Sequence, residues 1–136
     1  GHKFAILMID ADNFKAINDN YGHEAGNKLI KNIGFTVESN LRSSDVVARY
    51  GGDEFICLLI ETGLHDARIV ARRIHEQVSK LNVMEMNEKV STSVSIGIAC
   101  FPDDAKTMQE LIRCADQAMY ASKGRGKNQI SSVQVA

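Results

Sequence analysis

The chain has 136 residues and a mass of 15.0 kDa, with 44% hydrophobic and 24% charged residues, the size and composition of one globular domain with its own core. Its 16 basic and 17 acidic residues give a formal net charge of −1, so it lacks the basic excess of a nucleic-acid-binding protein, and nucleic acid is not an expected partner. The three cysteines include no C-x-x-C pair, which argues against a disulfide framework or a thiolate metal site.

In chain order, the first expected elements are a strand, a long helix and a hairpin. The run Phe4–Ile9 is entirely apolar, which predicts a central strand covered on both faces, and it is far shorter than the roughly 20 residues of a membrane-spanning helix. Apolar residues recur at three- and four-residue steps over 24–41, the period of an amphipathic helix. The β-prone runs Val46–Tyr50 and Phe55–Ile60 flank Gly51-Gly52-Asp53-Glu54, so they predict a hairpin with two carboxylates at its tip.

The second half of the chain repeats this alternation. Helical spacing returns over 67–81, and Val90–Ala99 alternates β-branched and small side chains, which predicts a strand with Gly97 where a neighbour can approach closely. Thr107-x-x-Glu110 forms a capping box that begins a third long helix, ending near Ser122. The order β-α-β-β-α-β-α-β predicts an α+β fold, a ferredoxin-like or palm-type sandwich in which helices pack on a mostly antiparallel central sheet.

Acidic side chains stand where two of these elements end. Asp10 and Asp12 follow the first strand, and Asp53 and Glu54 occupy the hairpin tip. Side by side, these two acidic ends would offer a hard cation such as Mg²⁺ the oxygen ligands it prefers. The alternative interpretation is that Asp12 caps a turn over residues 13–15 and that the hairpin acids are solvated. The pattern alone leaves both interpretations open.

A cluster of cations, Lys123, Arg125 and Lys127, follows the third helix among two glycines. Such a cluster either complements the helix dipole or neutralises a polyphosphate. It is not a Walker loop, because it follows a helix and lacks the G-x-x-x-x-G-K-[ST] spacing.

The hairpin sequence Gly51-Gly52-Asp53-Glu54-Phe55 resembles the signature of GGDEF domains, the diguanylate cyclase family. Four further blocks match this family in order and spacing across essentially the whole chain: Asp10-Ala-Asp12-Asn-Phe14-Lys15-Ala-Ile-Asn18-Asp19, Tyr21-Gly22-His23-Glu-Ala-Gly26-Asn27, Ser95-Ile-Gly97-Ile-Ala99 and Ala115-Asp116-x-x-Met119-Tyr120-x-x-Lys123-x-x-Gly126-Lys127-Asn128. The resemblance implies a palm-like sandwich related to nucleotidyl cyclase catalytic domains. It also implies that residues 1–136 are a single GGDEF domain, located in the cytoplasm. We expect this domain to be part of a longer multidomain protein. That parent protein would have a sensor or receiver domain upstream of the GGDEF domain and could also carry a membrane anchor.

In such domains two GTP molecules condense into cyclic di-GMP and two pyrophosphates, and each subunit of a homodimer holds one GTP. Carried over residue by residue, the metal ligands would be Asp10, the backbone carbonyl of Ala11, Asp53 and Glu54, which would hold two Mg²⁺ or Mn²⁺ ions per active site. Asp53 and Glu54 would also be the catalytic acids, and Asp53 is the family's proposed base. Which group takes the proton stays open.

The resemblance also implies four kinds of substrate contact. Backbone amides would cradle the β- and γ-phosphates as a helix N-terminus does, lysines would supply countercharge, glycines would let the backbone pass close to the nucleotide, and polar side chains would form the base pocket. These residues are Asn13, Phe14 and Lys15 for the amides, Lys123 and Lys127 for the countercharge, Gly51 and Gly52 for the close approach, and Asn18, His23 and Asn27 for the base pocket. His23 fits a ligand contact and a structural role equally well.

Two of these positions depart from the family pattern. The family usually has Asp where this chain has Asn27, and an amide accepts the guanine N–H groups less decisively than a carboxylate, which predicts weaker base selectivity. The family commonly has Arg where Lys127 stands. An arginine guanidinium can bind a phosphate through two hydrogen bonds at once, whereas a lysine ammonium offers one compact charge. The lysine should therefore weaken triphosphate binding without abolishing it.

Arg42-Ser-Ser-Asp45 has the spacing of the family's inhibitory R-x-x-D site, and Arg73 matches a basic residue that a second subunit presents to the bound product. In that interpretation Arg42 holds a phosphate or a guanine edge of cyclic di-GMP, and Asp45 accepts from a guanine edge. The alternative is a solvated ion pair between residues three apart, worth roughly a few tenths of a kcal/mol.

Three functional hypotheses follow. The first is an active, product-inhibited diguanylate cyclase, favoured by the intact hairpin acids and Asp10. The second is a catalytically silent domain that binds GTP or cyclic di-GMP as a regulatory module, favoured by Asn27 and Lys127. The third is a cyclase with altered base choice that makes a mixed guanine–adenine dinucleotide.

Overall fold

A five-stranded sheet forms the centre of the protein in this computed structural model, which describes residues 2–133. In chain order the elements are β1 (Phe4–Ala11), α1 (Phe14–Tyr21), α2 (His23–Ser39), β2 (Val46–Arg49), β3 (Glu54–Ile60), α3 (Leu64–Ser79), β4 (Val83–Glu85), β5 (Glu88–Val90), β6 (Val94–Phe101), α4 (Met108–Gly124) and β7 (Ile130–Ser132). None of the helices within residues 2–133 combines the length and the hydropathy needed to cross a membrane.

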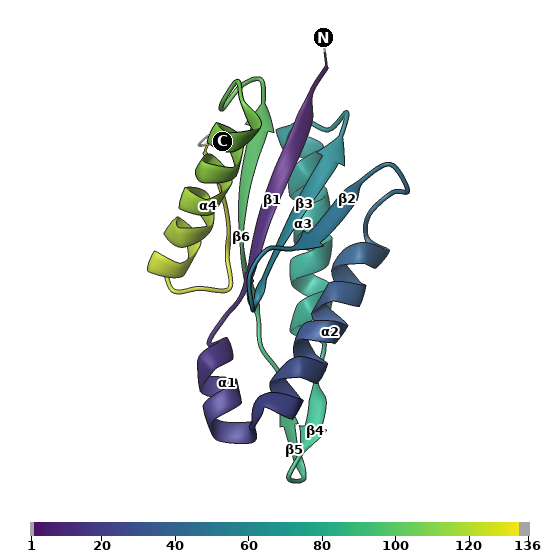
Figure 1. Ribbon diagram of the computed structural model, residues 1–136, viewed down its shortest axis with the longest axis vertical. Coiled ribbons are helices and arrows are strands. Elements are labelled where there is room, and N and C mark those ends of the chain that lie inside the picture. Colours follow the sequence, from purple (N-terminus) through teal and green to yellow (C-terminus); the bar gives the residue numbers. More distant parts are fainter. Residues whose placement is uncertain (1, 134–136) are drawn as a thin grey trace.

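The strand order across the sheet is β2-β3-β1-β6-β7. Neighbouring strands are antiparallel, except that β6 and β7 run parallel. Helix α4 lies on one face of the sheet, and α2 and α3 lie on the other (Figure 1). The predicted α+β sandwich with a mostly antiparallel central sheet is therefore confirmed.

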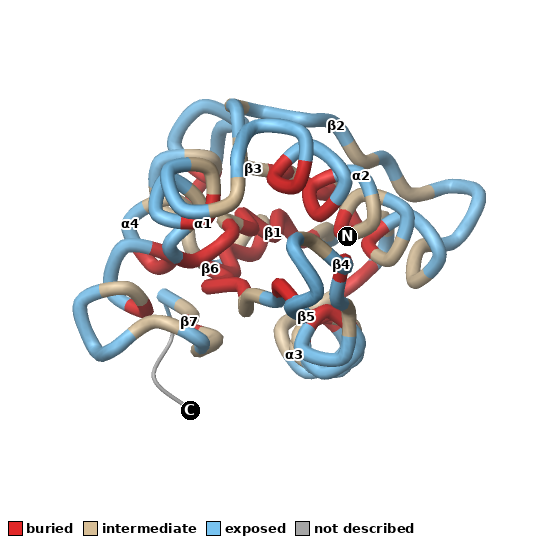
Figure 2. Tube along the Cα trace, turned by 90° about the horizontal axis from the view of Figure 1, so that it is seen from below, coloured by how far each residue is buried: buried red, intermediate tan, exposed pale blue. Residues whose placement is uncertain are grey.

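Strand β1 is the central strand that its apolar run predicted. Its side chains alternate between the faces, so Leu7 and Ile9 join the core beneath α2 and α3, while Ile6 and Met8 join a second core beneath α4. Each of the four is at most 1% exposed, and burying such a side chain stabilises the fold by about 1.5–3 kcal/mol. Figure 2 shows β1 and β6 as the buried centre within the exposed outer sides of the helices. The same alternation turns Asp10 toward α4, where it meets a lysine of that helix.

Helix α4 rests directly on strand β6 at Gly97. A Cβ at this position would lie closer than 3.0 Å to the Ala115 carbonyl oxygen and to the Met119 nitrogen, both of which belong to the α4 backbone. Only glycine permits this approach, as the sequence predicted, and the contact fixes the height of α4 above the sheet.

The strand expected over Val90–Ala99 is wrong in its first part. Its first residue ends β5, which pairs with β4, and the central strand β6 begins only at Val94. The polar segment between them leaves the sheet because it binds the end of β1. Thr92 Oγ1 donates to the Asp12 carbonyl across 2.5 Å, and the Asp12 N–H donates to the Ser93 carbonyl across 2.9 Å.

Helix α1 and the β4–β5 hairpin were not predicted. Helix α1 is short and mostly polar, with Ile17 as its buried residue, so it shows little apolar periodicity. The β4–β5 hairpin is joined to the end of α1, because the Tyr21 hydroxyl donates to the Glu88 carboxylate across 3.0 Å. The three long helices begin and end within three residues of their expected bounds.

Candidate active site

The two acidic ends predicted from the sequence lie side by side. Strands β1 and β3 are antiparallel neighbours, and their register pairs Asp10 with Glu54. The Ala11 N–H donates to the Asp53 carbonyl across 3.0 Å, which holds the hairpin tip beside the end of β1. Helix α1 begins just beyond this end of β1 (Figure 1), and the last turn of α4 reaches it through a lysine.

An open hollow of about 510 Å³ lies at this end of the sheet. Residues from the β1–α1 segment, the hairpin tip and the end of α4 line it: Ala11, Asn13, Phe14, Lys15, Ala16, Asp19, Asp53, Lys123 and Lys127. The fold thus brings one predicted metal-binding acid, the predicted phosphate-binding amides and both predicted lysines to one hollow.

Asp10 has an incompletely satisfied carboxylate. Its side chain is 15% exposed, Oδ2 lies 3.1 Å from Lys123 Nζ, and the buried Oδ1 finds no hydrogen-bond donor within residues 2–133. Burial outweighs the lysine and raises the pKa of Asp10 to about 7, and the nearby charges of Asp53 and Glu54 act in the same direction.

These features fit a divalent cation, which would bind the free oxygen of Asp10 and offset the mutual repulsion of the acids. Across residues 2–133 no cluster of three or more His, Cys, Asp or Glu side chains could hold a metal ion by itself. A bound ion would therefore take further oxygen ligands from the Ala11 carbonyl, from water and from substrate phosphates, as Mg²⁺ commonly does.

Glu54 lies on the α4 side of β3. Burial is the largest cause that raises the pKa of Glu54, and the negative charges of Asp116 and Asp53 raise it further. The positive charge of Lys123 acts to lower this pKa but does not outweigh them. A Cβ at Gly51 would lie 3.1 Å from Glu54 Oε1, so this glycine makes room for the Glu54 side chain. A Cβ at Gly52 would meet nothing within 4 Å among the described residues.

The interpretation of Asp12 as the cap of a turn is wrong. The residue before α1 is Asn13, which has no side-chain cap hydrogen bond. Asp12 is instead 1% exposed and accepts four hydrogen bonds from groups far away in the sequence. Burial would raise its pKa, but these donors together outweigh that effect and hold the pKa below its ordinary value. Sequence reasoning placed Asp12 beside Asp10 at the acidic end of the first strand, but it did not predict these four partners.

Two ammonium groups lie at the start of α1. Lys123 Nζ is bound to the two acids at the end of β1 and lies 3.4 Å from the Ala11 carbonyl oxygen, while Lys127 Nζ donates to Asn13 Oδ1 across 2.5 Å. Asn13 itself has left-handed backbone angles (φ 57°) and leads into α1. The first N–H groups of a helix have no intrahelical acceptor, so this helix start and the two lysines bring positive charge to one end of the hollow.

The predicted base-pocket residues lie on α1 and α2, outside the lining of the hollow. Asn18 Oδ1 is buried and has no partner among the described residues. A Cβ at Gly26 would collide with the Asn18 side chain, so the two helices pack closely here. His23 and Asn27 are exposed on α2. The structure thus offers one orphaned acceptor and two exposed polar groups for a base.

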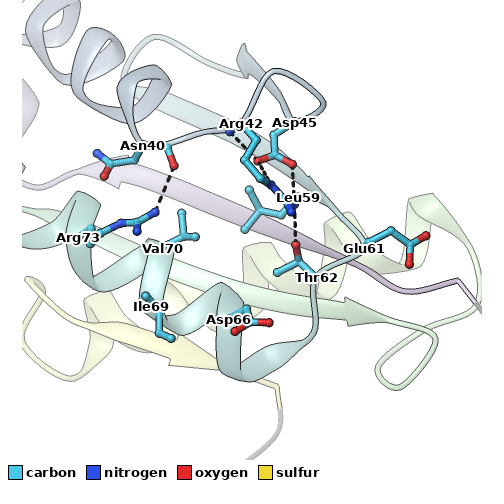
Figure 3. A pocket seen from close by; sticks show the side chains of 10 residues that line it. All are labelled: Asn40, Arg42, Asp45, Leu59, Glu61, Thr62, Asp66, Ile69, Val70 and Arg73. Atoms are coloured by element: carbon cyan, nitrogen blue, oxygen red, sulfur yellow. Dashed lines mark hydrogen bonds and ion pairs between the residues drawn. The ribbon is translucent and has the colours of Figure 1, made fainter.

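A second pocket, of about 240 Å³, contains all three residues of the predicted product site. Figure 3 shows Arg42 and Asp45 on one side of this pocket and Arg73, from α3, on the other. Arg73 Nη2 donates to the Asn40 carbonyl across 3.4 Å. Asp45 precedes β2, and its Oδ1 accepts from the Ile60 N–H at the end of β3 opposite the hairpin tip, which places this pocket about 20 Å from the acidic ends.

In the Arg42–Asp45 pair the arginine side chain is 58% exposed to solvent, whereas the carboxylate is buried. The Asp45 side chain is only 4% exposed, and it accepts from Arg42 through the backbone N–H (2.9 Å), Nε (3.2 Å) and Nη2 (3.1 Å). Arg42 Nη2 also donates to the Ile60 carbonyl (2.5 Å) and Thr62 Oγ1 (3.0 Å). The Asp45 carboxylate therefore orients the guanidinium and is itself fully occupied by protein donors.

Comparisons with known proteins supply the family. The chain matches the family described as diguanylate cyclase, GGDEF domain, over residues 1–129. Diguanylate cyclase A of Treponema denticola is 39% identical over 127 residues, which cover 93% of this chain and 34% of that protein. The chain spans about a third or less of the length of the first curated relatives it matches.

Two solved structures show the same likeness in three dimensions. The GGDEF domain of YfiN (TpbB) from Pseudomonas aeruginosa superposes with a TM-score of 0.91 at 38% identity, covering 99% of this chain and 84% of that one. The GGDEF domain of DgcB from Caulobacter crescentus, solved in complex with c-di-GMP, superposes with a TM-score of 0.89 at 27% identity, covering 97% of this chain and 78% of that one.

Proposed function

This chain belongs to the GGDEF family of diguanylate cyclases, and from that membership we propose that residues 1–136 are a single catalytic domain that condenses two GTP molecules into cyclic di-GMP and two pyrophosphates. The observation that supports the proposal is the end of β1, where a carboxylate with a buried, unpartnered oxygen lies opposite the hairpin acids and close to a helix start flanked by two lysines. A cation site beside an anion site is what a metal–triphosphate complex requires.

Asp10, the Ala11 carbonyl, Asp53 and Glu54 would hold Mg²⁺ or Mn²⁺, two ions per active site. When bound, the ions lower the pKa of the attacking hydroxyl and stabilise the charge that develops on the α-phosphate. Asp53 lines the hollow and Glu54 does not, which supports Asp53 as the acid that would accept the proton of the 3′-hydroxyl. Glu54 would keep the metal-binding end negative from its place opposite Asp10.

The triphosphate would lie over the start of α1. The N–H groups of Asn13, Phe14 and Lys15 would bind its β- and γ-oxygens, and Lys123 and Lys127, which line the same hollow, would neutralise the charge that remains. The guanine would lie between α1 and α2, where the unpartnered Asn18 Oδ1 can accept from a base N–H, and where His23 and Asn27 are exposed.

Catalysis would require two copies of the chain. Each copy has one such hollow at the end of β1, and the product contains two equivalent phosphodiester bonds. In each bond the 3′-oxygen of one nucleotide attacks the α-phosphorus of the other, and pyrophosphate leaves. A homodimer with the two hollows face to face meets this requirement, and an upstream domain of the parent chain would control its formation.

The pocket around Arg42, Asp45 and Arg73 would bind cyclic di-GMP and inhibit the enzyme. The guanidinium of Arg42 is already held by Asp45, which lowers the entropy lost when it binds a phosphate or a guanine edge. Arg73 faces the same pocket, and its long hydrogen bond to the Asn40 carbonyl is weak, so it can turn toward the ligand.

One observation favours a second candidate function. Asn27 is an exposed amide where the family usually has a carboxylate, and weak base recognition suits a silent domain that binds GTP or cyclic di-GMP, or a cyclase that accepts adenine as well. Turnover by an enforced dimer separates these alternatives from the leading proposal.

The test is the variant Asp53→Asn in a chain fused to a dimerising coiled coil. We expect the substitution to abolish pyrophosphate release from GTP while the unfolding transition stays unchanged, because Asp53 lines the hollow and packs no core. Asp103→Asn, an exposed acid of the turn after β6, is the matched control and should keep full turnover. Wild-type turnover in Asp53→Asn would refute the assignment.

A further inference from the structure

Two acids two residues apart at the end of β1 have opposite environments. Asp10 has an oxygen without a partner among residues 2–133, whereas Asp12 is 1% exposed and both of its oxygens are occupied. Oδ1 of Asp12 accepts from Ser95 Oγ (2.7 Å) and Lys123 Nζ (3.0 Å). Oδ2 accepts from Ser93 Oγ (2.5 Å) and from the backbone N–H at position 128 (2.9 Å). The Asp12 carboxylate has no free direction for a metal ion or a substrate.

We propose that Asp12 is a positioning residue, a buried anion that holds the last turn of α4 and the turn before β7 against the start of α1, so that the lysine of each faces the triphosphate. This inference rests on the proposed function for the identity of the ligand. The contacts that support it join three separate segments of the chain to the end of β1, namely the start of β6, the last turn of α4 and the turn before β7.

The turn before β7 shows why an anchor is needed. Lys127 and Asn128 both have left-handed backbone angles, with φ of 65° and 54°, which side-chain-bearing residues rarely adopt in succession. The Lys127 N–H donates to the Ser122 carbonyl across 3.0 Å, and the Asn128 N–H donates to Asp12 across 2.9 Å. These bonds hold the turn in the conformation that lets Lys127 Nζ reach Asn13 at the start of α1.

Lys123 depends on the same anchor. Its ammonium lies between the two acids, 3.1 Å from Asp10 and 3.0 Å from Asp12. A cation that bound Asp10 would compete for that carboxylate, whereas Asp12 is buried and saturated and would keep its bond to the lysine. One N–H of the ammonium then stays fixed on Asp12, and the N–H released by Asp10 can turn toward the phosphates, while the Ala11 carbonyl lies 3.4 Å from the same nitrogen.

The experiment measures binding of GTP and of GMP to the full chain by calorimetry, with Ca²⁺ replacing Mg²⁺ to hold back turnover. Asp12→Asn keeps the shape of the side chain and removes its charge. We expect it to weaken GTP binding at least about tenfold, the effect of one lost charge-assisted hydrogen bond, and to change GMP binding less than about twofold. Asp103→Asn is the control and should change neither affinity.

A purely structural role would not alter the ratio of the two affinities. Equal weakening of GTP and GMP, or no change in either, would overturn the inference. If Asp12→Asn fails to fold, Ser93→Ala, which leaves the charge and removes one donor, should shift the same ratio by a smaller factor, and an unchanged ratio there would overturn it as well. In a Lys123→Met background Asp12→Asn should add little further loss of GTP affinity, and full additivity would contradict the anchoring of Lys123.

Binding and turnover separate this inference from the proposed function. A wild-type chain that makes no cyclic dinucleotide, yet loses its preference for GTP over GMP on Asp12→Asn, would sustain the positioning role and refute the cyclase. A wild-type chain that binds GTP no more tightly than GMP would refute the positioning role directly.

Discussion

Replacing Gly97 by alanine tests whether the contact between α4 and β6 sets both the stability of the fold and the geometry of the site. The added Cβ would lie closer than 3.0 Å to two backbone atoms of α4, at Ala115 and Met119, where ordinary contact begins near 3.4 Å. Backbone in a helix cannot rotate away as a side chain can. The whole helix must therefore move out, by about 1 Å if the overlap is to be relieved.

Overpacking of this kind costs about 1–3 kcal/mol, and we expect Gly97→Ala at the upper end of that range, because the obstructing atoms are backbone. The same outward movement carries the last turn of α4 away from β1. Lys123 Nζ is 3.1 Å from Asp10 and 3.0 Å from Asp12, so a displacement of about 1 Å takes these pairs past hydrogen-bonding distance. We therefore expect weaker GTP binding as well as lower stability.

The assay is urea unfolding of the wild type, Gly97→Ala and the control Gly124→Ala, followed by GTP binding in Ca²⁺. Gly124 ends the same helix, and a Cβ there would meet nothing within 4 Å among the described residues. The control should be neutral or stabilised by up to about 1 kcal/mol, since alanine is the better helix former. A Gly97→Ala chain within about 0.5 kcal/mol of the wild type, with unchanged GTP affinity, would refute the reasoning.

Three further outcomes are expected. Asn27→Asp should tighten GTP binding in Ca²⁺ and widen its margin over ATP and inosine triphosphate in a competition assay, and equal selectivity in both proteins would show that position 27 does not contact the base. Arg73→Ala should raise the concentration of cyclic di-GMP that half-inhibits turnover, and unchanged affinity by calorimetry would remove Arg73 from the product site. Burial acts to raise the pKa of Asp45, but the donors from Arg42 and Ile60 outweigh burial and hold this pKa below its ordinary value. The stability that the ionised Asp45 contributes is therefore present above about pH 4, and it is lost as the pH falls through the lowered pKa of the folded state. Asp45→Asn should flatten the loss of stability between about pH 4 and pH 2, and parallel urea midpoints for both proteins over that range would contradict this.

Local patterns in the sequence predicted the elements that carry the acids. The all-apolar run Phe4–Ile9 specified a strand covered on both faces, and the hairpin followed from two β-prone runs around a glycine pair. Gly97 was predicted as a point of close approach, because a glycine inside a strand leaves room for a neighbouring backbone. Each of these signals is contained in one short continuous stretch of the chain, the longest being Val46–Ile60 for the hairpin.

The role of Asp12 could not be predicted in this way. Its partners Ser93, Lys123 and Asn128 lie 81, 111 and 116 residues further along the chain, and no local pattern connects them. A visible signal was the pair of serines at alternate positions before Gly97, which places two hydroxyls on the face that the acids share. Which acid these hydroxyls donate to depends on the register of β1 and β6, and that register is a property of the folded sheet.

The arrangement of helix α1 escaped prediction for a different reason. Its eight residues bury mainly Ile17, so its apolar pattern is too short to distinguish a helix from a turn. The helix is stabilised by packing on α2, where Gly26 permits close contact with Asn18. The base pocket that we propose between these two helices thus depends on tertiary contacts that no single segment encodes.

The most direct test of the central claim is the identity of the reaction product. The chain, fused to a dimerising coiled coil, is incubated with GTP and Mg²⁺, and the nucleotides are identified by mass spectrometry while pyrophosphate is quantified. We predict cyclic di-GMP with two pyrophosphates released per molecule of product, and none of it from Asp53→Asn under the same conditions. Absence of cyclic di-GMP from the wild-type dimer, in a preparation that calorimetry shows to bind GTP, would contradict the assignment of this domain as a diguanylate cyclase.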